Sequence, residues 1–371
     1  MRNETKLALI ITFLTFILSI IGIVSIYSSS SIWAQYLYND KFYYLKRQII
    51  FFIIGIFVFV IASKINLEKI KKHSFLWLVI SYLLLILVLI PGLGTLRNGS
   101  RSWFVIGGIG FQPAEIFKVT MIIYASYYLE KNYKTSHYFF RKIGPLLFLS
   151  LLGFGIIMLQ PDFGTGIVMI GTIVILTLIS KVSLKNYFKI GIMAVGALLV
   201  IILSEPYRIE RIYAFVDPWS DPLGSGFQTI QGLLAIGPGG VLGLGWDHSI
   251  QKHYFLPEPQ TDFIFAIICE EIGFIGGALI ILTFGLLISY VLKVAMKTSN
   301  KFEMFLSFGI AALISIQVVI NLGVVVGLLP VTGITLPFIS YGGTSLIILL
   351  FLMGLVVNIA KRRDVIENSN C

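Results

Sequence analysis

Apolar runs of about 20 residues recur along the whole of this 371-residue chain, and each is long enough to cross a hydrocarbon core of about 30 Å. Hydrophobic residues make up 57% of the sequence and charged residues only 12%, whereas soluble proteins average roughly 45–50% and about 25%. The runs are continuously apolar rather than alternating, which favours helices over membrane strands. The sequence therefore predicts an all-α polytopic membrane protein.

We expect a single integral membrane domain, residues 1–371, that crosses the bilayer about ten times. The expected spans are residues 7–27, 48–63, 75–90, 112–129, 144–159, 164–180, 189–204, 262–292, 304–327 and 340–360. The first run is too long for the core of a signal peptide, so we interpret it as an uncleaved span.

Basic residues divide the connections between these spans into two sets. Both termini and every second connection together carry 19 of the 28 Lys and Arg residues, the opposite loops carry 8, and Lys118 lies within a span. Because positively charged loops stay in the cytoplasm, both termini are predicted to be cytoplasmic. The net charge of +10 then reflects topology and contact with anionic membrane lipids, and we expect no nucleic-acid partner.

The outer loop between the seventh and eighth spans, residues 205–261, is unusually long, and connections of this length are usually functional. We expect it to carry the approach to an active site. Its run 226–245 is apolar, but glycines and a proline argue against a regular span, so a re-entrant or interfacial segment is predicted.

The stretch "FLPEPQTDFIFAIICEE" places one carboxylate, Asp262, at the boundary between this loop and the next span. Thr261 or Asp262 could cap the helix that follows, since an acid there complements the helix dipole. Asp262 could equally be a catalytic carboxylate whose pKa is raised by partial desolvation. The two interpretations are compatible.

A second candidate site lies on the same side, in "GTLRNGSRSWFVIGGIGFQPAEIFKV". Arg97 and Arg101 flank a turn at Asn98-Gly99, with Trp103 close by in the sequence. Two guanidinium groups suit a pyrophosphate or another anionic head group. Phospholipid anchoring with an interfacial tryptophan is the alternative.

Several further polar residues lie at or within the spans. Glu115 and Lys118 are three residues apart, on one face of a helix, and form either a structural ion pair or the lining of a polar cavity. Asp162, in a short outer turn, is a helix cap or a second acid facing the same site. Glu270 and Glu271 lie deeper in the eighth span and are candidates for pairing with a neighbouring helix.

The connection before the last span, "LPVTGITLPFISYGGTS", contains Ser340 and is rich in helix-breaking residues that can line a cavity. No metal-binding or nucleotide-binding motif occurs in the sequence. His248 and His253 match no metal-ligand spacing, so we expect no tightly bound metal or cofactor, although Mg²⁺ or Mn²⁺ could accompany an anionic substrate.

These segments together resemble the SEDS family (shape, elongation, division and sporulation), and more closely its FtsW and sporulation protein E branch. The matching text is "RNGSRSWFVIGGIGFQPAEIFK", "QPDFGTG", "FVDPWSDPLGSGFQTIQGLLAIGPGGVLGLG", "YFLPEPQTDFIFAIICEEIGFIGG" and "GLLPVTGITLPFISYGGTSL". The resemblance implies a peptidoglycan glycosyltransferase of the bacterial cytoplasmic membrane that serves cell shape, division or sporulation. Such enzymes polymerise lipid II, an undecaprenyl-pyrophosphate-linked disaccharide pentapeptide, with a cognate class B penicillin-binding protein as the transpeptidase.

The resemblance also assigns roles to residues. It makes Asp262 the catalytic residue and identifies five substrate-site residues, to which the residue analysis adds Asp162 and Ser340. The five are Arg97, Arg101, Trp103, Glu115 and Lys118. As a hypothesis, Asp262 is the general base for the acceptor sugar's 4-hydroxyl, and the cationic groups stabilise the departing pyrophosphate.

Two other functions remain open from the sequence. A transporter of the lipid-linked precursor would also use intramembrane charges and interrupted spans, but it should need polar groups along both halves of a path. A scaffold that recruits cell-wall synthases would use the loops as docking surfaces, but it does not explain paired intramembrane charges or a boundary carboxylate.

Overall fold

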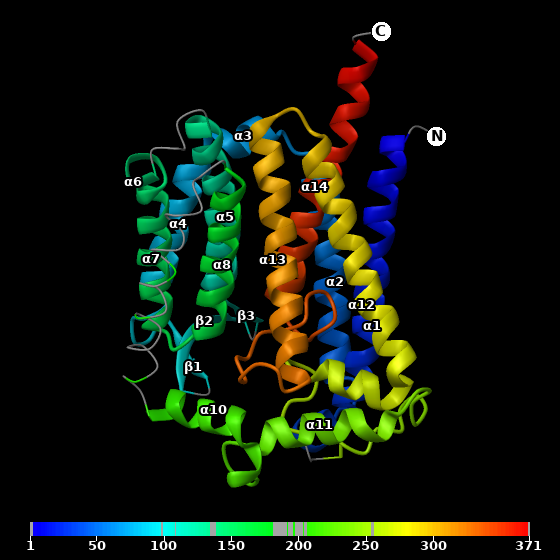
Figure 1. The fold of residues 1–371 in the computed structure, drawn as a ribbon. Helices are drawn as coiled ribbons and strands as arrows, with labels where there is room; N and C mark the ends of the chain where they lie inside the picture. Colours follow the sequence, from blue (N-terminus) through cyan, green and yellow to red (C-terminus); the bar gives the residue numbers. More distant parts are fainter. Residues whose placement is uncertain are drawn as a thin grey trace.

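The long helices lie alongside one another in a bundle, with both termini at one end and a set of short outer elements at the other (Figure 1). The computed structural model describes residues 3–369 apart from 98, 108, 134–138, 181–190, 192–195, 197–202, 204–205 and 254–255. The helices of the bundle are α1 (Asn3–Tyr38), α2 (Tyr43–Ala62), α4 (Ser74–Leu87), α5 (Pro113–Asn132), α7 (Gly144–Met158), α8 (Phe163–Ile179), α12 (Ile264–Lys297), α13 (Lys301–Val325) and α14 (Gly343–Ser369). Short helices α3 (Leu67–Lys72) and α6 (Phe139–Lys142) precede α4 and α7.

Nine of the ten predicted spans coincide with one of these helices, and the predicted span 189–204 falls almost entirely outside the described residues. Within the described part of the chain, five helices are long and apolar enough to cross a membrane, namely α1, α2, α12, α13 and α14. Three more, α4, α7 and α8, are apolar but shorter. The polytopic helical fold predicted from hydropathy is confirmed.

Two helices form the centre of the bundle. Helix α13 packs against α12, α5 and α8, and α14 packs against α1 and α2. In both central helices 67% of the most apolar window is buried, against 28% in α2 and α12. Apolar side chains on the outer helices therefore remain exposed, as a lipid solvent requires.

Small residues bring α2 and α14 into close contact, which is how helices associate without a hydrophobic driving force between them. A Cβ atom on Gly354 would lie 2.6 Å from the carbonyl oxygen of Phe59, so only glycine fits there. The Asn358 side chain then donates hydrogen bonds of 2.9 and 2.7 Å to the carbonyl oxygens of Ala62, the last residue of α2, and Ile65, which follows the helix.

A three-stranded antiparallel sheet between α4 and α5 was not expected from the sequence. It consists of β1 (Thr95–Arg97), β2 (Ser100–Ile106) and β3 (Ile109–Phe111), in the order β1-β2-β3. Gly99 and Gly107 have φ values of 78° and 58° at its two tight turns, as hairpin turns require. The predicted Asn98-Gly99 turn is thus a hairpin turn, although Asn98 itself lies outside the described residues.

The outer loop contains helix α10 (Pro206–Val216), a short 3₁₀ turn at Pro218–Ser220 and helix α11 (Phe227–Gly239). Figure 1 shows α10 and α11 running across one end of the bundle, roughly perpendicular to the long helices. Of the two possibilities for the run 226–245, this orientation fits an interfacial segment better than one that re-enters the bundle.

Helix α12 is broken at Gly273, whose φ of 68° and ψ of −171° are accessible essentially to glycine alone. The outer loop fills the break. Leu244 and Gly245 donate their amides to the carbonyl oxygens of Glu270 and Glu271, at 2.9 and 3.0 Å. On the other side of the break, Phe274 donates to Gly240 at 2.9 Å and Ile275 to Val241 at 3.3 Å.

Gly273→Ala should destabilise the protein strongly. The residue would be forced into a backbone region that costs about 1–3 kcal/mol for other residues. In addition, its Cβ would lie 2.4 Å from the Gly243 amide nitrogen. Thermal melts in detergent should therefore show a lower Tm than wild type.

Gly285→Ala is the matched control, because Gly285 lies in the same helix and a Cβ there meets no atom within 4 Å. Its Tm should be unchanged or higher, since alanine is the better helix former. Equal Tm values for the two variants would contradict the importance of the break.

Candidate active site

Asp262 immediately precedes α12 and does not cap it. The helix begins at Ile264, its N-cap residue is Phe263, and no side chain makes a capping bond there. The prediction that Thr261 or Asp262 caps this helix is therefore wrong. The Asp262 carboxylate instead accepts a 2.7 Å hydrogen bond from the Thr261 hydroxyl, receives no other from the described residues, and is partly exposed.

The connection between α13 and α14 is hydrogen-bonded to the backbone around Asp262, both directly and through Asn321. The buried side-chain amide of Asn321 donates 2.8 Å hydrogen bonds to the carbonyl oxygens of both Asp262 and Ile334. Farther along this connection, the Tyr341 amide donates to the Gln260 carbonyl oxygen at 2.8 Å. The backbone on either side of the carboxylate is thus fixed to one loop.

Ser340 lies in the same connection, where its hydroxyl accepts a 2.8 Å hydrogen bond from the amide of Leu336 and closes a turn. Ser340 is buried, with 6% of its surface exposed. Its predicted contact with substrate stays a prediction, whereas its contribution to the turn is evident.

Glu115 and Lys118 form a buried ion pair near the start of α5, with Nζ and Oε1 2.7 Å apart. Asp162 is joined to the same end of α5 through Gln112, which lies three residues before Glu115. The Asp162 carboxylate accepts bonds from the side chain of Gln112 at 2.7 Å and from the amide of Thr165 at 3.1 Å. The predicted ion pair and the predicted cap on α8 are both confirmed.

Burial raises the pKa of Asp162 above its ordinary value of 3.8, even though the amide and hydroxyl of Thr165 and the positive charge of Lys118 act in the opposite direction. The charge of Glu115 adds to the rise. A carboxyl that is partly accessible yet surrounded by protein in this way is typical of a functional site.

Asp162, Glu115 and Lys118, which we call the Asp162 cluster, are attached to the connection between α13 and α14, as Asp262 is. A Cβ on Gly164, in the first turn of α8, would lie 2.6 Å from the carbonyl oxygen of Thr332. Thr332 is two residues from Ile334, which shares the Asn321 amide with Asp262. Two clusters that are about 100 residues apart in sequence are therefore linked through one loop.

The small sheet adjoins the Asp162 turn, because Ser100 donates a hydrogen bond to the Gln160 carbonyl oxygen. Arg101 donates from Nη1 to the carbonyl oxygen of Leu89, just beyond α4, at 3.4 Å, and its buried Nε has no partner among the described residues. Trp103 is partly buried on β2, and the side chain of Arg97 lies outside the described residues. The two arginines therefore share a hairpin.

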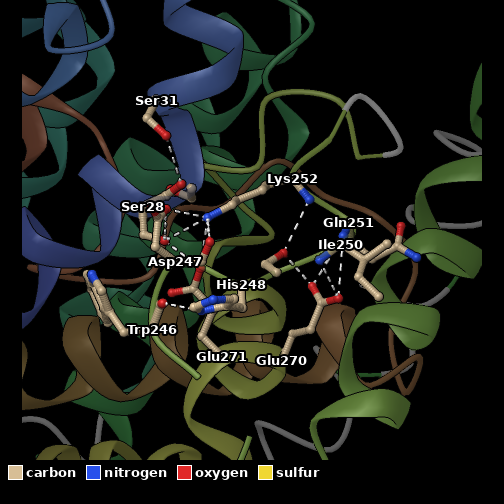
Figure 2. A network of polar contacts seen from close by, with 12 residues as sticks. Ser28, Ser31, Trp246, Asp247, His248, Ile250, Gln251, Lys252, Glu270 and Glu271 are labelled. Carbon is tan, nitrogen blue, oxygen red and sulfur yellow. Dashed lines mark hydrogen bonds and ion pairs between the residues drawn. The ribbon is translucent and has the colours of Figure 1, made fainter. Parts of the chain in front are cut away.

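Glu270 and Glu271 pair with the outer loop rather than with a helix alone (Figure 2). Glu270 accepts hydrogen bonds from the Ser249 hydroxyl at 2.5 Å and from the Ile250 amide at 2.9 Å. Glu271 lies 3.4 Å from Lys252 Nζ and also accepts from the hydroxyl of Ser28 in α1. The prediction of a neighbouring helix as partner is correct only for Ser28.

Three residues of these clusters were not identified in the sequence: Gln112, Asn321 and Lys252. Asn321 carries the clearest signal, because an amide inside an apolar span is costly unless it has partners. Lys252 also stands out as a basic residue on the outer side, against the charge bias. Gln112 offers no such signal.

Comparison with known proteins shows similarity over nearly the full length. The FtsW, RodA and SpoVE family model, described as a cell cycle protein, matches residues 8–365. Stage V sporulation protein E of Bacillus subtilis (strain 168) is 44% identical, covering 97% of this chain and 98% of that protein. A probable peptidoglycan glycosyltransferase FtsW of Geobacter sp. (strain M18) is 36% identical, covering 98% and 99%.

Solved structures share the fold. A chain from a study of structural coordination of polymerization and crosslinking by a peptidoglycan synthase complex matches with a TM-score of 0.76 and 30% identity, over 95% of this chain and 97% of that one. The rod shape determining protein RodA of Thermus thermophilus matches with a TM-score of 0.71 and 26% identity, over 95% and 96%. The bundle described above is therefore an arrangement that known membrane proteins also adopt.

Asp162→Asn should change how stability depends on pH. Because burial raises the Asp162 pKa in the folded protein, the folded state binds this proton more tightly than the unfolded state. The contribution of Asp162 to the unfolding free energy should then fall as pH rises above about 3.8, the unperturbed value, toward the folded pKa. Relative to the variant, the wild-type Tm should decline across this window in melts from about pH 3.5 to 7.

Asp221→Asn is a control of opposite sign. Hydrogen bonds from Ser225 hold the pKa of this exposed carboxyl below its ordinary value. Wild type should therefore keep or slightly gain Tm relative to Asp221→Asn as pH rises. A rising wild-type advantage over Asp162→Asn would contradict the burial argument.

Proposed function

This chain belongs to the FtsW, RodA and SpoVE family, and from that membership and the site geometry we propose how it works. The family resemblance expected from the motifs is confirmed. The protein is a multi-pass membrane protein and a peptidoglycan glycosyltransferase that acts in cell division or sporulation.

The proposed substrate is lipid II, and the proposed location is the outer face of the bacterial cytoplasmic membrane. The outer loop and the sheet lie at the end of the bundle opposite the termini, which supports this location (Figure 1). A related chain comes from a peptidoglycan synthase complex. We infer that this protein likewise works with a class B penicillin-binding protein, which crosslinks the glycan that it makes.

The state of Asp262 is the observation that carries the catalytic proposal. Its carboxylate is not used as a helix cap, has one hydrogen bond from Thr261 among the described residues, and is partly exposed. Its backbone is fixed by Asn321. A fixed carboxylate with unused acceptor capacity suits a general base.

In the proposed reaction, the 4-hydroxyl of the acceptor sugar gives its proton to the Asp262 carboxylate while the oxygen attacks the anomeric carbon of the donor. The bond from that carbon to the pyrophosphate oxygen breaks, and undecaprenyl pyrophosphate leaves with the electron pair. Because the leaving group is already an anion, it needs little protonation, so a single essential carboxylate is sufficient.

Positive groups would stabilise the charge that develops on the departing pyrophosphate. We propose Arg97 and Arg101 for this task, with Trp103 beside them, and Lys118 as a contributor from the Asp162 cluster. Lys118 is held by Glu115, which keeps its ammonium group at a defined point. Asp162 and Ser340 are proposed to shape the remaining wall of the substrate site.

No three His, Cys, Asp or Glu side chains converge to hold a metal ion in the part of the chain that the structure describes. We propose that Mg²⁺ or Mn²⁺ would enter together with the pyrophosphate of the substrate.

Asp262→Asn should abolish glycan synthesis, because an amide cannot accept the proton. We expect at least about a hundredfold loss of lipid II polymerisation, within the range attributed to general acid–base catalysis. The assay would use the purified protein with its class B partner, whose transpeptidase is blocked. Asp221→Asn, another acid of the outer loop, is the control and should polymerise like wild type.

Thermal melts would establish that Asp262→Asn is folded. Full activity of that variant would refute the role of Asp262. Absence of glycan from wild type, together with lipid II crossing a vesicle membrane in its presence, would favour the transporter function instead.

Arg97→Ala and Arg101→Ala should each weaken lipid II binding. Loss of a charge-assisted contact to pyrophosphate should raise KM by about tenfold, in line with about 1.5–3 kcal/mol for a hydrogen bond to a charged group. Arg141→Ala, at the opposite end of the bundle, should leave KM unchanged. An unchanged KM in both outer variants would instead support lipid anchoring by this hairpin.

A further inference from the structure

We propose that Lys252, Glu270 and Glu271 form a positioning clamp for Asp262, an inference that rests on the catalytic role proposed for that residue. The clamp is the cluster in Figure 2, where the outer loop meets α12 and α1. Lys252 and Glu271 are bound to each other and Glu270 is bound to the loop, so none is assigned a catalytic role. Their effect would be exerted through the backbone that carries Asp262.

One half of the clamp is the buried carboxylate of Glu270. Besides the Ser249 hydroxyl and the Ile250 amide, the Gln251 amide points at it, 3.4 Å from both oxygens. Glu270 is 0% exposed, so these neutral donors replace its hydration entirely. The chain at 249–251 is therefore held to α12 by a charged acceptor.

The other half is the ion pair of Lys252 and Glu271, whose side chains are 2% and 3% exposed. Lys252 also donates to the backbone carbonyl oxygen of Asp247 at 2.6 Å and pairs with the Asp247 carboxylate. Glu271 accepts in addition from Ser28 of α1. Three separate segments of the chain thus meet at one buried charge pair.

The clamp closes a loop that has Asp262 near its middle. Lys252 and Glu271 are 19 positions apart, and Asp262 lies ten residues after the first and nine before the second. Within this loop Leu256 and Gln260 are buried. Closing a short loop removes most of the conformations available to its midpoint.

The part of α12 between Asp262 and the clamp is a short, buried piece of helix. Every residue from Phe263 to Glu271 is buried, and the helix breaks two residues later, at Gly273. A displacement of Glu271 would therefore be transmitted along less than three turns of rigid helix to Asp262. Misplacement of a catalytic group by about 1 Å can cost about a hundredfold in rate.

The chemistry of a buried ion pair gives a specific test. Lys252→Met would leave the Glu271 carboxylate as an uncompensated buried charge, whereas Glu271→Gln would leave Lys252 paired with Asp247, whose side chain is 50% exposed. Replacing both partners with neutral groups is often tolerated. Lys252→Met should lower kcat by about ten- to a hundredfold and Glu271→Gln by less, with KM for lipid II nearly unchanged in both. The double variant should recover kcat to within about threefold of wild type, because the amide oxygen introduced by Glu271→Gln can still accept from Ser28.

Lys46→Met is the matched control. Lys46 also pairs with an aspartate on the outer side, Asp40, at 2.8 Å, but this lysine side chain is 64% exposed. The Lys46→Met variant should keep the kcat, KM and Tm of wild type, since exposed ion pairs contribute little to stability.

Native-state hydrogen exchange provides a readout independent of activity. In either single variant, exchange should accelerate in the segment 252–262 while α13 and α14 keep their protection. The double variant should restore slow exchange in that segment. If a single variant does not fold, Ser249→Ala, which removes one donor to Glu270, should show the same pattern more weakly.

Two results would overturn the proposal. The first is wild-type kcat in folded single variants, and the second is a double variant no better than the worse single one. If these occur while Asp262→Asn is inactive, the clamp inference fails and the catalytic proposal stands. If Asp262→Asn is active, the catalytic proposal fails by its own test.

Discussion

The break in α12 is possible only because the backbone groups that it releases find partners within the protein, as the interior of a membrane protein requires. Residues 240–245 supply those partners, and the rest of the outer end is organised around them. The loop that fills the break continues into the clamp, and the clamp leads to Asp262. The piece of α12 before Gly273 is short enough to be fixed at both ends, by the clamp at one and by Asn321 and the connection between α13 and α14 at the other.

The polar groups proposed for the substrate site are grouped around one connection of the bundle. The Asp162 cluster and the Asp262 segment belong to different helices, yet both are attached to the connection between α13 and α14. Because α13 and α14 are the most buried of the five long apolar helices, this connection is firmly supported. In the proposed reaction, a site that aligns two lipid-linked sugars would benefit from walls attached to one rigid element.

Hydropathy predicted the spans because this signal depends on the bilayer and not on contacts between helices. The orientation expected from the basic residues stays a prediction. The Glu115 and Lys118 pair was predictable from helical spacing, and the Asp162 cap from its position before α8. The predicted cap at Asp262 was wrong because the helix starts two residues later than the apolar run suggested. The Lys252 and Glu271 pair and the Gln112 contact join residues distant in sequence, so no local pattern indicates them. The small sheet was not predicted because its strands are only three to seven residues long.

Gly273 also divides α12 into a short buried piece and a long piece with exposed apolar side chains. Beyond it, the helix from Phe274 to Lys297 exposes Phe274, Leu279 and Leu282, and it extends about 36 Å at 1.5 Å per residue. That length slightly exceeds an average hydrocarbon thickness, and such helices adjust by tilting. Since no continuous helix crosses Gly273, a change in tilt of the long piece would reach the segment before Gly273 through the bonds of Gly240 and Val241 to Phe274 and Ile275. The outer loop is therefore the mechanical connection between the lipid-facing piece of α12 and the end that carries Asp262.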